Sequence, residues 1–166
     1  MRSFTEELKT GRLLFDGSMG ALLSSMGKAS DHPELYNIEE PELIQGVHSR
    51  YIGAGANVVI TDSLGATPLR LRRTDLKDRV PELTEAAVKN ARAAAGNKAL
   101  VALDIGPLGA LLEPMGQLPF ERAYDLFAEI AEAGAFLLGE HAGFITGTDL
   151  LIDGGTIAAI DRKSVV

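Results

Sequence analysis

Short apolar runs that alternate with longer amphipathic stretches are the feature that most constrains how this chain can fold. Three runs have the apolar character of buried strands, at residues 13–15, 57–61 and 99–105. Stretches with the apolar spacing of helices follow them, at residues 41–51, 81–95 and 120–133, and a shorter helix can begin at Met19. Strands that alternate with helices in this way are typical of a parallel sheet, either doubly wound or closed into a (β/α) barrel. We therefore predict an α/β fold with about three βα units.

The length of the chain limits how much of a barrel it can contain. A complete (β/α)8 barrel needs ~250 residues, whereas this chain has 166. The alternation stops after Gly134, and the strand-like run that follows, at residues 150–153, is short. We predict a partial barrel followed by one short strand, with open sheet edges, and expect the chain either to self-associate through these edges or to stay partly molten.

Composition excludes several classes of function. The net charge is −7, and no stretch of Lys and Arg is dense enough to follow a nucleic-acid backbone, so no nucleic-acid partner is expected. The N-terminal segment lacks the apolar centre of a signal peptide, and no run approaches membrane-spanning length, so we expect a cytoplasmic protein without a membrane partner. The chain has no cysteine, and His32, His48 and His141 are scattered, so each histidine is interpreted as a surface or packing residue and no metal site is predicted.

Polar residues at or just after the carboxyl ends of the apolar runs are the candidates for a ligand site. Asp16, Thr61 and Asp104 stand at these positions, and ligands of parallel α/β sheets bind beyond the carboxyl ends of the strands. A carboxylate there could hold an ammonium group, and a threonine hydroxyl could donate to a carboxylate. The alternative is that each Asp only caps a helix or braces a turn, which the spacing alone favours.

Three segments carry a resemblance to a known family: LLFDGSMGALL at 13–23, PELYNIEEPELIQGVHSRYIGAGANVVITDSLGAT at 33–67, and VALDIGPLGALLEPMG at 101–116. Over residues 10–134 the chain resembles the homocysteine-binding domain shared by methionine synthases, betaine-homocysteine methyltransferases and bacterial fusions with methylenetetrahydrofolate reductase. The resemblance implies a (β/α)8 TIM barrel that binds homocysteine at its carboxyl rim. It also implies that zinc, held by three cysteines, activates the homocysteine sulfur.

The resemblance assigns substrate-binding residues one by one. Asp16 and Gly17 match the Asp-Gly that contacts the amino-acid end of the substrate, Thr61 matches a threonine that contacts the same end, and residues 104–107 match the turn after the third strand. Residues 61–64 read Thr-Asp-Ser-Leu where many relatives have Thr-Asn-Thr-Phe, so the detailed loop contacts are expected to differ.

The zinc cysteines of the family lie on later strands that this chain does not contain. Without a metal, an alkyl thiol with a pKa near ~8.5 stays mostly protonated at neutral pH. We therefore expect a truncated homocysteine S-methyltransferase domain with no cofactor, no catalytic residue and no metal ligand of its own. It should bind homocysteine weakly at most and should not transfer methyl groups to it.

The C-terminal part has two other resemblances. Residues 136–160 resemble the C-terminal end of a short-chain dehydrogenase/reductase, but the cofactor loop and the Tyr-x-x-x-Lys pair of that family are absent, so no oxidoreductase activity is expected. Residues 161–166 match a translated sequencing adaptor and are interpreted as an artefactual tail. The predicted organisation is therefore 1–134, 135–160 and 161–166. The alternatives are a non-enzymatic binding or assembly module, or a fragment of a short-chain dehydrogenase/reductase fusion.

Overall fold

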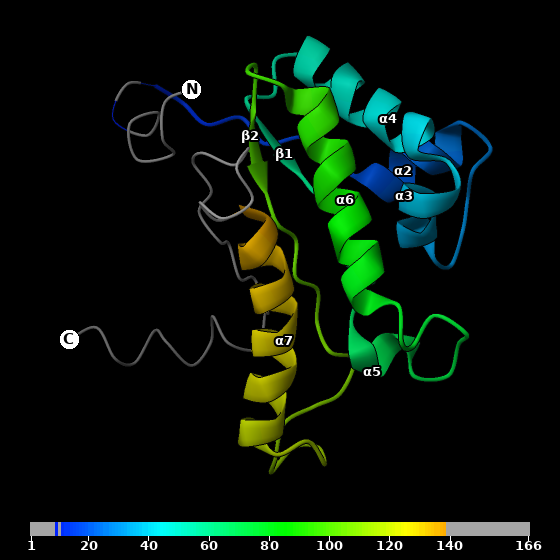
Figure 1. The fold of residues 1–166 in the computed structure, drawn as a ribbon, viewed down its shortest axis with the longest axis vertical. Coiled ribbons are helices and arrows are strands. Elements are labelled where there is room, and N and C mark those ends of the chain that lie inside the picture. Colours follow the sequence, from blue (N-terminus) through cyan, green and yellow to red (C-terminus); the bar gives the residue numbers. More distant parts are fainter. Residues whose placement is uncertain (1–8, 10, 139–166) are drawn as a thin grey trace.

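The computed structural model describes residue 9 and residues 11–138 (Figure 1), and the predictions for residues 139–166 lie outside this part of the chain. The two described strands are preceded, separated and followed by helices. In chain order, the elements are α2 (Met19–Ser25), a 3-10 helix (Pro33–Leu35), α3 (Tyr36–Glu39), α4 (Pro41–Gly53), β1 (Val58–Ile60), α5 (Pro68–Leu71), α6 (Val80–Ala95), β2 (Leu100–Ala102) and α7 (Phe120–Leu138).

The sheet within the described residues is parallel. Strand β1 pairs with β2 in the register Val58 to Leu100 and Ile60 to Ala102. The first predicted strand, 13–15, is reduced to an isolated parallel bridge between Phe15 and Val58. Phe15 is 41% exposed, so this segment lacks the packing that would hold a longer strand. The parallel α/β arrangement is confirmed, whereas a complete third strand is not seen.

Helix α6 is the centre of the described fold. It packs between α4 and α7, and it also contacts both strands (Figure 1). Its apolar spacing predicts one face with Leu83, Ala87, Ala91 and Ala94, of which the first three are buried and Ala94 is half-buried. The helix ends at Gly96, whose φ of +50° lies in the region that favours glycine.

Helix α7 differs from its prediction in length and in one core residue. It continues to Leu138 rather than ending at residue 133. The apolar spacing of residues 120–133 predicts that Phe120, Ala123 and Ile130 face the core. Ala123 and Ile130 are buried, but Phe120 is 60% exposed, so that part of the prediction is wrong. Phe120 is the first residue of the helix, one turn before the buried stripe begins.

No helix within the described residues is both long enough and apolar enough to cross a bilayer.

Candidate functional site

The loops that follow β1 and β2 are joined by a closed ring of hydrogen bonds. The backbone N–H of Asp104 donates to Thr61 Oγ1 at 2.9 Å, and Ser63 Oγ donates to the Asp104 carbonyl oxygen at 2.7 Å. The Thr61 and Ser63 hydroxyls lie 2.7 Å apart. Because the single proton of Ser63 is already donated to the carbonyl, Thr61 must be the donor between the two hydroxyls. The Thr61 hydroxyl proton is therefore already used in a hydrogen bond to Ser63, and Thr61 is only 2% exposed.

Asp16 braces the N-terminal segment against β1. Its two carboxylate oxygens lie 3.1 and 3.2 Å from the backbone nitrogen of Ile60, and its own N–H donates to the Val58 carbonyl at 3.0 Å. The side chain of Asp16 is 3% exposed. Asp16 thus braces a strand far along the chain rather than its own turn, and the helix that follows it is capped by Ser18. A carboxylate has about four acceptor positions, so one N–H leaves several of them free.

His48 of α4 lies next to Asp16 and was not predicted to belong to this site. Its Nδ1 is 3.7 Å from Asp16 Oδ2, its side chain is fully buried, and neither ring nitrogen has a hydrogen-bond partner among the described residues. The sequence assigned His48 to a surface or packing position. Helical spacing places it on the buried face that includes Ile44 and Val47, so its burial could have been foreseen.

Gly17 leaves room for an aromatic side chain. A Cβ at this position would lie 2.9 Å from Tyr51 Cε1, and the Tyr51 hydroxyl donates to the Ser18 carbonyl at 3.1 Å. Gly17 therefore lets the turn after Asp16 pack directly on α4. The substrate contacts assigned to Asp16, Gly17 and Thr61 stay predictions.

A cluster of acidic side chains lies beside the ring and was missed by the sequence analysis. The pKa of Asp62 is raised from its ordinary 3.8 to about 7. Burial is the largest cause, and repulsion from the carboxylates of Glu34 and Asp104 adds to it. Asp62 is 7% exposed, and its Oδ2 has no hydrogen-bond partner among the described residues. Asn37 ties the cluster together by donating to the Asp62 carbonyl at 2.7 Å and the Glu34 carbonyl at 2.9 Å.

Glu34 has a specific position in this cluster. It is 1% exposed, and a Cβ at Gly65 would collide with its carboxylate. His32 Nδ1 lies 3.1 Å from Glu34 Oε1. No local pattern marks Glu34 as buried, because its burial depends on a loop about 30 positions later in the chain.

Comparisons with known proteins point to one family over most of the chain. A family model described as Homocysteine S-methyltransferase matches residues 13–156. Homocysteine S-methyltransferase 1 of Brassica oleracea var. italica is 35% identical over 120 residues, which cover 61% of this chain and 37% of that protein. The apo form of the homocysteine methyltransferase MmuM from Escherichia coli has a TM-score of 0.59 and 29% identity, covering 80% of this chain and 48% of that one.

A second, shorter similarity involves another class of protein. The short-chain dehydrogenase/reductase bsc3 of Alternaria brassicicola is 47% identical over 47 residues, which cover 28% of this chain and 17% of that protein. The chain spans less than half the length of these relatives and solved structures.

The residues of this chain do not fit a zinc site built from cysteines. The sequence contains no cysteine. Within residues 9 and 11–138, no group of three or more His, Asp or Glu side chains is arranged to hold a metal ion.

Proposed function

The chain belongs to the homocysteine S-methyltransferase family, and on this basis we propose that its described part forms the amino-acid side of a homocysteine site. The observation that carries the proposal is the linkage of Asp16, Thr61 and Asp104 at one rim of the sheet. The Asp16 carboxylate binds the N–H of Ile60, the residue before Thr61, and the Thr61 hydroxyl binds the N–H of Asp104. Parallel α/β folds place their ligands at this rim.

Each side chain has a distinct role in the proposed site. The unused acceptor positions of Asp16 would receive the substrate ammonium group. Gly17 would allow the substrate to approach the backbone closely. Thr61 would donate to the substrate carboxylate only after its hydrogen bond to Ser63 breaks. Substrate binding would therefore break one hydrogen bond of the ring.

We propose that this chain alone binds homocysteine weakly and does not methylate it. Only the amino-acid end of the substrate has candidate partners, so few contacts offset the ordering cost of binding, and an affinity of about 1 mM is expected. No thiolate ligand is available to hold a metal against the substrate sulfur, and the free thiol stays mostly protonated at pH 7. A non-enzymatic binding or assembly role has no separate observation in its favour.

Calorimetry with L-homocysteine on the full chain tests the binding proposal. Asp16→Asn should weaken binding by about tenfold or more, because the ammonium group loses its charged acceptor. Asp75→Asn changes an exposed carboxylate outside the site and should leave the affinity unchanged. Equal affinity in the wild type and Asp16→Asn would overturn the assigned role.

Methionine formation is measured separately, with homocysteine and each of the methyl-donor classes used by relatives. Production above the rate without protein would overturn the proposed inactivity. It would not affect the binding proposal.

A further inference from the structure

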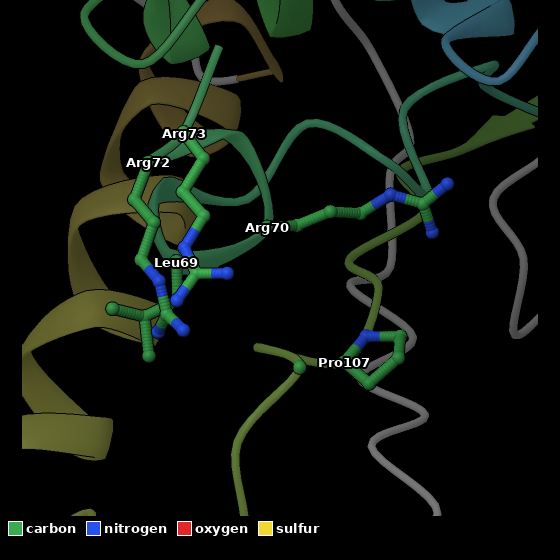
Figure 2. Close-up of a pocket in the computed structure, with 6 residues that line it drawn as sticks. Leu69, Arg70, Arg72, Arg73 and Pro107 are labelled. Carbon is green, nitrogen blue, oxygen red and sulfur yellow. The ribbon is translucent and has the colours of Figure 1, made fainter.

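An open cavity of about 350 Å³ lies where α5 and the residues after it meet the loop after β2. It is lined by Leu69, Arg70, Arg72, Arg73, Pro107 and Gly109. Figure 2 shows the side chains of Arg72 and Arg73 extending in the same direction past Leu69, whereas Arg70 extends toward the side of Pro107.

The charge of this cavity is opposite to that of the chain. The chain carries a net charge of −7, yet three of the six lining residues are arginines. Within the part of the chain that the structure describes, none of the three forms an ion pair with a carboxylate. Arg70 makes one long hydrogen bond, 3.4 Å, to the Asp31 carbonyl oxygen. All three arginines are exposed, and because arginine does not lose its charge in proteins, they give this cavity a local positive charge.

Buried neighbours fix both walls of the cavity. Leu71 is fully buried, so it anchors the segment that carries Arg70, Arg72 and Arg73. On the other wall Leu108 is 4% exposed, between the lining residues Pro107 and Gly109. The two walls are joined because Thr67 Oγ1 donates to the Pro107 carbonyl at 3.4 Å. The cavity is therefore built on two anchored loops.

We propose that this cavity binds a small anion with two or more negative charges, carried by phosphate or carboxylate groups. The guanidinium fork matches both groups in a bidentate manner. The volume is at the lower end of the range for small-molecule sites, ~300–1,000 Å³. Residues 70–73, Arg-Leu-Arg-Arg, form a basic segment that is too short to follow a nucleic-acid backbone but is long enough to bind a small ion. This proposal does not depend on homocysteine binding.

Titration of the full chain at low salt with pyrophosphate and with citrate tests the proposal. We expect saturable binding of at least one of them and a higher Tm in its presence, because the anion binds the folded state. The double variant Arg72→Gln/Arg73→Gln should bind about tenfold or more weakly. Arg50→Gln, an exposed arginine outside the cavity, should bind like the wild type.

Binding of pyrophosphate alone would identify a phosphate site, and binding of citrate alone a carboxylate site. Absence of saturable binding of both anions at about 10 mM would overturn the proposal. Equal affinity in the wild type and in a double variant with an unchanged circular dichroism spectrum would also overturn it.

Discussion

Replacing Asp62 by asparagine should stabilise the protein at high pH and have little effect at low pH. Burial and the neighbouring carboxylates raise the pKa of Asp62 from 3.8 to about 7 in the folded state. Below pH 4 the carboxyl is protonated in both the folded and the unfolded chain, so it contributes nothing to the pH dependence. Between pH 4 and 7 only the folded chain keeps the proton, and the free energy of unfolding rises as pH falls. Above pH 7 the folded chain carries the full penalty of the buried charge.

The magnitude follows from the same values. The difference between 3.8 and about 7, multiplied by ~1.4 kcal/mol for each pH unit, gives ~4 kcal/mol as the upper limit of the penalty. An asparagine amide keeps the size of the side chain and removes the charge. We therefore expect Asp62→Asn to raise the free energy of unfolding by ~1–4 kcal/mol at pH 8.

Urea denaturation of the wild type and Asp62→Asn at pH 4.5, 6 and 8 is the assay. The free energy of unfolding of Asp62→Asn relative to the wild type should increase steadily from pH 4.5 to pH 8. The exposed control Asp75→Asn should show no such increase. A gain that is equal at all three values, or larger at pH 4.5 than at pH 8, would refute the reasoning about the buried charge.

Three further predictions concern packing, metal content and association. Gly106→Ala should destabilise the chain by ~1–3 kcal/mol, because a Cβ there would overlap the Leu64 carbonyl oxygen. Gly20 has open space around it, so Gly20→Ala should not destabilise the chain. Similar unfolding midpoints for the two variants would contradict this prediction. Elemental analysis after dialysis against a weak chelator should find no stoichiometric zinc, and one zinc per chain would show that we have missed a site. Size-exclusion chromatography with light scattering should find self-association, or thermal denaturation should find a broad transition, because the sheet within the described residues has only two strands and both of its edges lack a further full strand. A strictly monomeric chain with a sharp cooperative unfolding transition would contradict this prediction.

The helices were the most predictable part of the fold, because their signals are local. Pro41 begins α4 and Gly96 follows the end of α6, and the sequence placed both boundaries within one or two residues. The strand at residues 13–15 was overestimated, because pairing depends on neighbours that a local apolar run does not reveal. Phe120 was misplaced for a similar reason: periodicity gives the face of a helix but not the point at which the helix reaches the core.

The candidate site was predictable in position but not in its interactions. Hydrogen bonds from the Ile60 N–H to Asp16 and from the Asp104 N–H to Thr61 bring the ends of the apolar runs together, whereas the substrate contacts assigned to these residues stay predictions. The hydrogen-bond ring through Ser63 and the burial of Asp62 arise between loops that are far apart in the sequence. Such contacts leave no periodic signal, so sequence patterns could not show that the Thr61 proton is already committed.

Titration of the isotope-labelled chain with L-homocysteine, followed through its backbone amide signals, tests the central claim most directly. The N–H of Ile60 reports on Asp16, and the N–H of Asp104 reports on Thr61, because each donates to that side chain. We predict that both signals shift along one saturation curve at about 1 mM, and that both shifts are lost in Asp16→Asn. Saturable binding that leaves both signals unchanged, or the same shifts in Asp16→Asn, would contradict the assignment of this rim as the amino-acid side of a homocysteine site.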